Sequence, residues 1–489
     1  MLAYSKARKN WIFYQVLHEF FERLRKMTNK LLLESLQELV EPGKVLTDSE
    51  SLEAYGKDWT KIYTPNPMAI VFPKTTEEVQ AIVQWANAHK IALVPSGGRT
   101  GLSGASVATN QEVVVSFDYM NKIIGFNKID REVICQPGLI TEQLQNFAEE
   151  KGLYYPVDFA SVGSSQIGGN IATNAGGIKV IRYGMTRNWV VGLKVVTGKG
   201  DVLDLNKGLI KNATGYDFRN LFIGAEGTLG FIVEATIKLE RKPINLTALV
   251  LATSDFESIM SLLHAFQSKL DLTAFEFFSD RCLEKILDRG DIPAPFDDRY
   301  PFYALIEFEA PTDTIKDEAL TIFENCMEQG WVVDGVISQS EQQLKNLWRL
   351  REDISETIAP YTPYKNDLSV TISKVPNFLT DIDAVVKSDY PDFDVLWYGH
   401  IGDGNLHLNI LKPENLAKEE FFAKCATVNK DVFEIVKKYN GSVSAEHGVG
   451  LVKRDYLEYS RSAVEIEYMR LVKAVFDPNN IMNPGKIFN

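Results

Sequence analysis

The sequence predicts an α+β fold with two main domains, on three observations. A strand–helix–strand pattern at residues 68–98 indicates layered helices and sheet. A glycine-dense region covers residues 96–230, and glycine becomes sparse after Lys242 and Pro243, where we place a domain boundary. Residues 395–410 have the pattern of a β-hairpin. The length of 489 residues also favours two or three domains.

The first 27 residues form an extension that is basic at its start and amphipathic. Its apolar stretch is interrupted by His18 and Glu19, which is untypical of a signal peptide. One interpretation is a helix that makes peripheral contact with the inner membrane or with a partner protein. Another is a helix packed on the body, or residues upstream of a true start at Met27. The sequence leaves these alternatives open.

The next elements follow from helix signals and apolar strands. Residues 28–40 predict an amphipathic helix with Thr28 as its N-cap. Between the strands at 68–72 and 91–94, a helix begins at Thr75 or Thr76, because Glu77 and Glu78 then lie in its first turn. Beyond the boundary, residues 244–266 and 299–310 predict a strand followed by a helix, and then another strand. Residues 470–476 predict the last helix.

Composition limits the partners. The net charge of −13 argues against a nucleic-acid partner, and it means that an anionic substrate needs a local basic pocket. There is no run of eighteen apolar residues, so no membrane-spanning helix is expected. The four cysteines are scattered, without a CxxC pair, which favours a reducing, cytoplasmic location.

The stretch PSGGRTGLSGA, residues 95–105, follows an apolar strand and contains four glycines. Successive backbone amides in such a loop can form an anion nest suited to a pyrophosphate, although a plain glycine-rich turn is the alternative. The chain has neither GxGxxG nor GxxxxGK[ST], which excludes a Rossmann fingerprint and a P-loop. Two more stretches, at 156–184 and 215–239, are also glycine-rich. Together they suggest one long ligand lying across a sheet-and-loop surface.

These three stretches together resemble the FAD-binding domain of the vanillyl-alcohol oxidase superfamily. They read P-x-G-G-x-T-G-L-x-G, then D-x-A-S-x-G-x-x-x-x-G-G-N-x-A-x-N-A-G-G, then G-x-E-G-x-L-G. Within the superfamily, the chain resembles the FAD-linked D-2-hydroxyacid dehydrogenases, which include D-lactate, glycolate and D-2-hydroxyglutarate dehydrogenases. The resemblance covers nearly all of the chain from Met27, and Ala105 departs from it where many relatives carry glycine.

The resemblance implies a vanillyl-alcohol-oxidase-type FAD-binding domain and an antiparallel-sheet cap domain with helices. It implies that the pyrophosphate lies over residues 96–100. No histidine lies between His89 and His264, so the three glycine-rich stretches offer no histidine to which the flavin could be attached covalently. The FAD is therefore predicted to be non-covalent. The predicted FAD-binding residues are Pro95, Ser96, Gly97, Gly98, Arg99, Thr100, Gly101, Ser103, Gly104, Pro156, Asp158, Ser161, Gly163, Gly168, Gly169, Asn170, Thr173, Asn174, Gly176, Gly177, Glu226, Gly227, Gly230, Ile232 and Asn483.

Two of the six histidines flank a tight turn in YGHIGDGNLHLNI, residues 398–410. Two short strands joined by Gly-Asp-Gly-Asn predict a hairpin that brings His400 and His407 to one end of a sheet. Glu446 and His447 follow further along the chain. Two imidazoles and a carboxylate are a common ligand set for a divalent metal, but satisfied histidines on a packed sheet are the alternative.

The resemblance favours the metal. Zinc-dependent members of the family carry G-H-x-G-D-G-N-x-H-x-N and a later E-H-G, and both motifs are present here. The match implies one divalent metal, most simply zinc, held by His400, His407 and Glu446. It implies His447 as the catalytic base and as a substrate contact, together with Asn409.

These parts suit the oxidation of a 2-hydroxy acid. The substrate loses a hydride from Cα, which FAD accepts at N5, and a proton from its hydroxyl. A metal makes the hydroxyl more acidic, and an imidazole can accept the proton.

A basic pocket is predicted upstream of the hairpin. Arg351 and Ser355 are four residues apart on a predicted helix, so they share a face, and Lys365 follows two prolines. An ordinary solvated helix is the alternative. The resemblance implies that Arg351, Ser355 and Lys365 bind the substrate, with serine in place of the threonine of D-2-hydroxyglutarate dehydrogenases.

We therefore expect four parts: an N-terminal extension (1–27), an FAD-binding domain (28–243), a cap domain with the metal site (244–460) and a C-terminal segment returning to the flavin (461–489). The predicted function is oxidation of a D-2-hydroxy acid, favouring D-2-hydroxyglutarate or a similar dicarboxylate. The alternatives are a D-lactate dehydrogenase, the flavin subunit of a glycolate oxidase complex and a non-catalytic flavin-binding subunit. A quinone, a cytochrome or an electron-transfer flavoprotein could accept the electrons, and a homodimer is left open.

Overall fold

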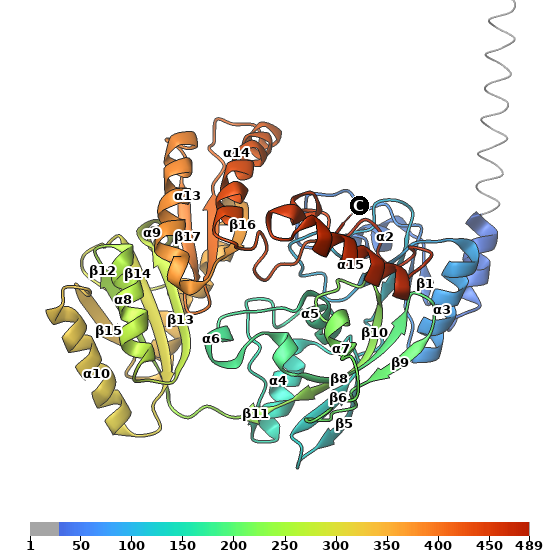
Figure 1. Cartoon of the computed structure of the whole chain (residues 1–489), viewed down its shortest axis with the longest axis horizontal. Coiled ribbons are helices and arrows are strands. Elements are labelled where there is room, and N and C mark those ends of the chain that lie inside the picture. Colours follow the sequence, from blue (N-terminus) through green and yellow to red (C-terminus); the bar gives the residue numbers. More distant parts are fainter. Residues whose placement is uncertain (1–28, 489) are drawn as a thin grey trace, which may run out of the picture.

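The computed structural model describes residues 29–488, and the N-terminal extension lies outside them. Helices and sheets form two parts, with the first drawn in blue and green and the second in yellow and orange (Figure 1). The C-terminal helix α15 (Ala463–Phe476) lies back over the first part. Within the described residues, no helix is long and apolar enough to cross a membrane.

The first part begins with a four-stranded sheet in the order β1-β2-β4-β3. β2 and β3 run parallel to β4, and helix α3 connects β2 to β3, so the strand–helix–strand unit at residues 68–98 is present. Thr75 is the N-cap of α3, because its hydroxyl accepts from the Glu78 N–H at 3.2 Å. The elements are β1 (Val45–Leu46), α2 (Ser49–Tyr55), β2 (Ala69–Val71), α3 (Thr76–His89), β3 (Leu93–Ser96) and β4 (Val113–Ser116).

A five-stranded antiparallel sheet in the order β5-β6-β10-β8-β9 completes the first part, with a two-stranded ladder of β7 and β11. Short helices between its strands lie within the glycine-rich stretches at 156–184 and 215–239. The elements are β5 (Ile123–Asn127), β6 (Glu132–Cys135), α4 (Thr141–Glu150), β7 (Leu153–Tyr154), α5 (Ile167–Thr173), α6 (Val180–Tyr183), η1 (Thr186–Asn188), β8 (Val190–Thr197), β9 (Val202–Leu205), α7 (Arg219–Phe222), β10 (Gly230–Lys238) and β11 (Glu240–Arg241).

The second part is built on a seven-stranded antiparallel sheet in the order β15-β12-β14-β13-β17-β18-β16. Its elements are β12 (Leu246–Thr253), α8 (Phe256–Gln267), β13 (Leu272–Ser279), α9 (Asp280–Leu287), β14 (Phe302–Glu309), α10 (Asp313–Glu328), β15 (Asp334–Ile337), α11 (Glu341–Glu352), α12 (Ile354–Thr357), η2 (Ala359–Tyr361), β16 (Tyr364–Ser369), η3 (Ile372–Lys374), α13 (Val375–Asp389), β17 (Val395–His400), β18 (Asn405–Ile410), α14 (Lys418–Lys438) and η4 (Arg454–Tyr459).

The two faces of this sheet bury different side chains, because alternate residues of a strand point in opposite directions. One face packs its apolar residues, such as Phe275, Ile306 and Leu408, with those of α8, α10, α13 and α14. The other face packs residues such as Phe278 and Leu305 with those of α9, α11 and α12. This second face also carries the polar residues of the candidate site.

The hairpin predicted at residues 395–410 is confirmed. β17 and β18 pair with His400 opposite Asn405 and Tyr398 opposite His407. The single helix predicted to carry Arg351 and Ser355 is wrong in detail, since α11 ends at Glu352 and α12 begins at Ile354. The break falls at Asp353, whose carboxylate accepts from Arg289 and Arg349 at 3.1 Å each. The contact with Arg289 is tertiary and could not be predicted from local spacing.

Candidate active site

A cavity lies between the glycine-rich loop after β3 and helices α5 and α7. Of the residues predicted to bind FAD, those that line it are Pro95, Gly97, Gly98, Arg99, Thr100, Gly101, Ser103, Gly168, Gly169, Asn170, Thr173, Glu226, Gly227, Gly230 and Ile232. A close backbone contact explains the glycine at position 98, and a positive φ explains the glycine at position 227. A Cβ on Gly98 would lie 2.2 Å from the Ser164 carbonyl oxygen, and Gly227 has a φ of +71°.

Other predicted residues lie beside the cavity or beyond it, and their role stays a prediction. They are Ser96, Gly104, Pro156, Asp158, Ser161, Gly163, Asn174, Gly176, Gly177 and Asn483. Asn483 supports the wall, because its side-chain amide donates to the carbonyls of Ala105 (2.8 Å) and Glu226 (2.7 Å). The C-terminal segment therefore contacts the glycine-rich part at Asn483.

Sequence reasoning missed several wall residues, namely Ala105, Ser106, Phe117, Pro137, Gln166, Ala172, Phe222 and Phe231. Most are apolar or small, so no polar motif marks them. Gln166 is more informative, because its amide donates to Asp118 at 2.8 Å. In the described part of the chain, two buried atoms have no hydrogen-bond partner, namely Gln166 Oε1 and the Ser103 hydroxyl oxygen. A buried polar atom without a partner indicates that a ligand supplies one, and FAD, with its polar groups along a flat body, fits this cavity.

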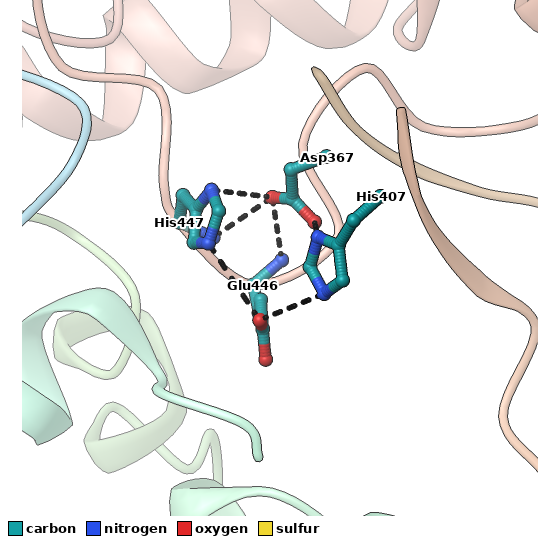
Figure 2. Close-up of side chains that lie close together, drawn as sticks. All are labelled: Asp367, His407, Glu446 and His447. Carbon is teal, nitrogen blue, oxygen red and sulfur yellow. Dashed lines mark hydrogen bonds and ion pairs between the residues drawn. The ribbon is translucent and has the colours of Figure 1, made fainter. Parts of the chain in front are cut away.

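A second cluster lies on the polar face of the seven-stranded sheet. Figure 2 shows Asp367, His407 and His447 around Glu446. Glu446 Oε1 lies 3.5 Å from His407 Nε2, 3.6 Å from His447 Nε2 and 3.8 Å from His400 Nε2. Ligands about 2.1 Å from a tetrahedral ion lie roughly 3.4 Å from one another, so these spacings suit a divalent metal. β17, β18 and the loop after α14 bring these residues together.

A buried carboxylate contacts the outer nitrogen of His400, and a second buried carboxylate lies near that of His407. His400 Nδ1 lies 2.8 Å from Glu276 Oε1, and His407 Nδ1 lies 4.0 Å from Asp367 Oδ1. Metal-ligating histidines commonly have such a partner, which fixes the tautomer and the ring orientation. Burial opposes a charge on His400, but Glu276 and Glu446 outweigh it and raise the pKa of His400 above its usual value. Burial lowers the pKa of His407 well below its usual value, which favours the neutral ring that a metal needs.

Asp367 is another possible metal ligand. One ligand atom from each of four residues lies within 4.8 Å of the others: Asp367, His407, Glu446 and His447. We favour His400 over Asp367 as the ligand, because Asp367 is already engaged. Its carboxylate accepts from the Asn405 side chain (3.0 Å) and from the backbone N–H groups of Glu446 (3.1 Å) and His447 (3.0 Å). Burial disfavours its charge, but the neighbouring His447, Lys453 and His407 outweigh this and lower its pKa.

The residues predicted to bind substrate lie on this sheet face or on the helices that pack against it, since Lys365 and Asn409 are on β16 and β18 and Arg351 and Ser355 are on α11 and α12. Lys365 is opposite Asn409 in the pairing of β16 with β18. Two residues along each strand, on the same face, Asp367 is opposite His407. Lys365 donates to the Ser355 hydroxyl at 2.9 Å, and burial lowers the pKa of the lysine. No described residue hydrogen-bonds to Arg351 Nε, although this atom is buried.

Tyr398 lies at the centre of these groups and was not predicted. The Arg351 guanidinium lies 4.6 Å from the centroid of its ring, and the His407 ring is 5.0 Å away. Burial raises the pKa of the Tyr398 hydroxyl to about 12, so it stays protonated near neutral pH. The signal was available, because Tyr398 precedes His400 by two residues and therefore shares its face.

The two parts of the protein meet at this cluster. A Cβ on Gly176, in the glycine-rich part, would lie 3.1 Å from Glu446 Oε2. Glu226, which lines the cavity, accepts from the backbone N–H groups of Val449 (2.5 Å) and Gly450 (2.7 Å) in the loop that carries Glu446. Burial raises the pKa of Glu226 to about 7. The cavity and the metal-type cluster are therefore neighbours.

The fold and this pair of sites define an FAD-binding flavoprotein. One family model, described as an FAD binding domain, matches residues 67–206, and another, described as FAD linked oxidases, C-terminal domain, matches residues 242–487. The chain belongs to the FAD-linked oxidase family. It is an oxidoreductase, and the predicted FAD cofactor is confirmed.

Two relatives are similar over most of this chain. The D-2-hydroxyglutarate dehydrogenase of Stutzerimonas stutzeri (strain A1501) is 74% identical over 94% of this chain and 100% of its own length. The D-2-hydroxyglutarate dehydrogenase of Xanthomonas citri pv. viticola is 54% identical over 94% of this chain and 98% of its own length.

A solved structure has the same fold at low sequence identity. The 4-ethylphenol oxidase from Gulosibacter chungangensis superposes with a TM-score of 0.72 at 15% identity, over 94% of this chain and 97% of that one. The predicted α+β fold of the vanillyl-alcohol oxidase type is confirmed.

Proposed function

We propose that this protein oxidises a D-2-hydroxy acid to the 2-oxo acid, and that D-2-hydroxyglutarate is its preferred substrate. One observation carries the proposal. His400, His407 and Glu446 converge beside the FAD cavity, and the buried Arg351 guanidinium lies over Tyr398, next to this cluster. The two named relatives support the choice of substrate.

His400, His407 and Glu446 would hold one divalent metal, most simply zinc. When bound, the metal would bind the C1 carboxylate and the hydroxyl and make the hydroxyl more acidic. The FAD, held without a covalent bond, would accept the hydride at N5. Flavin that remains with the protein after acid precipitation would contradict non-covalent binding.

His447 would take the hydroxyl proton. It is the most open imidazole of the cluster, since its side chain is 21% exposed and those of His400 and His407 are 8% exposed. Its Nδ1 lies 3.5 Å from Asp367 Oδ2, a carboxylate that would orient the ring and stabilise its protonated form. Its Nε2 faces the metal-type cluster, where the hydroxyl would lie.

Arg351 and Lys365 would bind the distal carboxylate of a dicarboxylate, with Ser355 and Asn409 as hydrogen-bond partners. A chain with a net charge of −13 needs such local cations for a dianion. The Arg351 guanidinium can meet a carboxylate bidentately, and the Asn409 side chain offers both a donor and an acceptor.

The test is anaerobic reduction of the bound FAD by a panel of D-2-hydroxy acids, followed by turnover with an artificial dye. D-2-hydroxyglutarate should bleach the flavin faster than D-malate, D-lactate or glycolate. Absence of bleaching by every acid would contradict the proposal and favour a non-catalytic flavin subunit. Faster bleaching by D-lactate would keep the reaction class and overturn the choice of substrate.

The reduced flavin would pass its electrons to an external acceptor: a quinone, a cytochrome or an electron-transfer flavoprotein. We propose a cytoplasmic protein, in which the N-terminal extension is the candidate for any peripheral membrane contact. Comparing turnover of full-length protein with these three acceptors, with and without vesicles, tests this. The homodimer that the sequence leaves open is tested by light scattering on the FAD-loaded protein.

A further inference from the structure

Glu276 is a buried carboxylate in the middle of a strand, with the apolar residues Ala274, Phe275, Phe277 and Phe278 on either side of it. It lies on β13 within the sequence LTAFEFFS, and its side chain is 1% exposed. Its two oxygens face different partners. Oε1 lies 2.8 Å from His400 Nδ1, and Oε2 lies 2.9 Å from Arg351 Nη2. One carboxylate therefore contacts both a candidate metal ligand and the candidate arginine of the substrate pocket.

The register of the sheet creates this arrangement. Phe277 pairs with Gly399 across β13 and β17, so Glu276 lies next to His400 on the same face. Arg351 comes from α11, which packs on that face, and its guanidinium lies over the Tyr398 ring. A buried carboxylate is costly without partners, so Glu276 holds both groups in place and is held by them.

We propose that Glu276 is a positioning residue that joins the two halves of the substrate site. Through His400 it orients the metal, and through Arg351 it orients the group that binds the distal carboxylate. Glu276 itself touches neither the metal nor the substrate. The inference rests on the proposed function and adds that metal affinity and selectivity for dicarboxylates depend on this single side chain.

The test compares Glu276→Gln with Glu307→Gln. Glu307 is a matched control, because it is a 2% exposed carboxylate on the neighbouring strand β14. Its partners are Lys179 (2.5 Å), Thr273 (2.5 Å) and the Trp348 indole (2.7 Å), and none of these is assigned to the metal or the substrate. Both substitutions remove one buried negative charge from this region and keep the side-chain size.

Two readouts are needed, on FAD-loaded protein. The first is the Kd for zinc, measured without turnover by competition with a chromophoric chelator. The second is the ratio of kcat/KM for D-2-hydroxyglutarate to that for D-lactate, at saturating zinc with a dye acceptor. Glu276→Gln should weaken zinc binding by about 10–100-fold, the usual effect of losing the partner of a ligating histidine. It should lower the selectivity ratio by about 10–100-fold, as expected for a lost interaction with a charged group.

Glu307→Gln should lower thermal stability and change neither readout. Combining Glu276→Gln with Arg351→Ala should lower the selectivity ratio no further than Arg351→Ala alone, because the two residues act as one unit. If Glu276→Gln does not retain FAD, the zinc Kd and the selectivity ratio are measured on Glu276→Asp instead. The same changes are expected, since the shorter side chain cannot reach both partners.

Several results would overturn the inference. A variant that changes only one readout would show that Glu276 serves one half of the site, and a variant that changes neither would remove its role. Equal effects of Glu276→Gln and Glu307→Gln would show a general cost of altering this sheet face. Failure of the proposed function is seen separately, in wild-type protein that binds no zinc or does not prefer D-2-hydroxyglutarate.

Discussion

At the scale of single residues, His447 should decide the rate of proton removal. His447→Ala should slow the reduction of FAD by about 10²–10⁴-fold, the usual effect of losing a general base, and should leave FAD bound. Stopped-flow absorbance of the flavin measures this. His264→Ala is a control, because His264 is an exposed histidine on α8. Reduction of the variant at the wild-type rate would assign the proton to another group.

Arg351 should decide between dicarboxylates and monocarboxylates. Arg351→Ala should cost D-2-hydroxyglutarate about 2–4 kcal/mol in kcat/KM, by analogy with breaking a buried charge pair, and D-lactate much less. Arg349→Ala is the control, since Arg349 lies on the same helix and pairs with the exposed Asp291. Equal losses for the two substrates would place Arg351 at the C1 carboxylate.

At the scale of secondary-structure elements, the loop after β3 should tolerate no side chain where it passes other backbone. Gly98→Ala should prevent FAD binding, because the new Cβ would lie 2.2 Å from a backbone oxygen of Ser164. Gly163→Ala is a stringent control, since Gly163 was also predicted to bind FAD but its nearest contact would be an ordinary 3.7 Å to Glu142. The absorbance ratio of flavin to protein after purification checks both variants. A Gly98→Ala protein with full FAD would contradict this account of the loop.

Local sequence patterns predicted some secondary-structure elements and site residues but not others. The hairpin at 395–410 was predictable, because turn formers and alternation are local signals. Glu276 and Asp367 were not singled out, because they belong to strands distant in sequence that meet His400 and His407 only through sheet register. A charged residue inside an apolar strand was nevertheless a signal at Glu276. The break at Asp353 coincides with a contact to Arg289, 64 residues away, which no local pattern reveals.

At the scale of the whole molecule, the metal and the flavin should be separable. The candidate ligands lie on the seven-stranded sheet and on the loop after α14, whereas the residues that line the cavity belong to the glycine-rich part. A chelator should therefore abolish turnover and leave FAD bound, and added zinc should restore turnover. Flavin absorbance after gel filtration, with metal analysis, checks this. Full activity in metal-free protein would remove the metal from the proposed function.

The contact between the two parts should also depend on pH through Glu226. Burial raises its pKa to about 7, above the value of 4.5 expected in the unfolded chain. The folded state therefore binds this proton more tightly, so the stability contributed by Glu226 is fully present below pH 4.5 and is lost as the pH rises through about 7. A pKa shift of this size corresponds to roughly 3 kcal/mol of folding free energy.

Glu226→Gln resembles the protonated form of Glu226, so this variant should lose less stability than wild type between pH 5 and pH 8. Denaturant unfolding of the FAD-loaded proteins at both pH values measures the difference. Parallel pH dependence of the two proteins would mean that Glu226 is already ionised at pH 5, and that its hydrogen bonds with Val449 and Gly450 outweigh its burial.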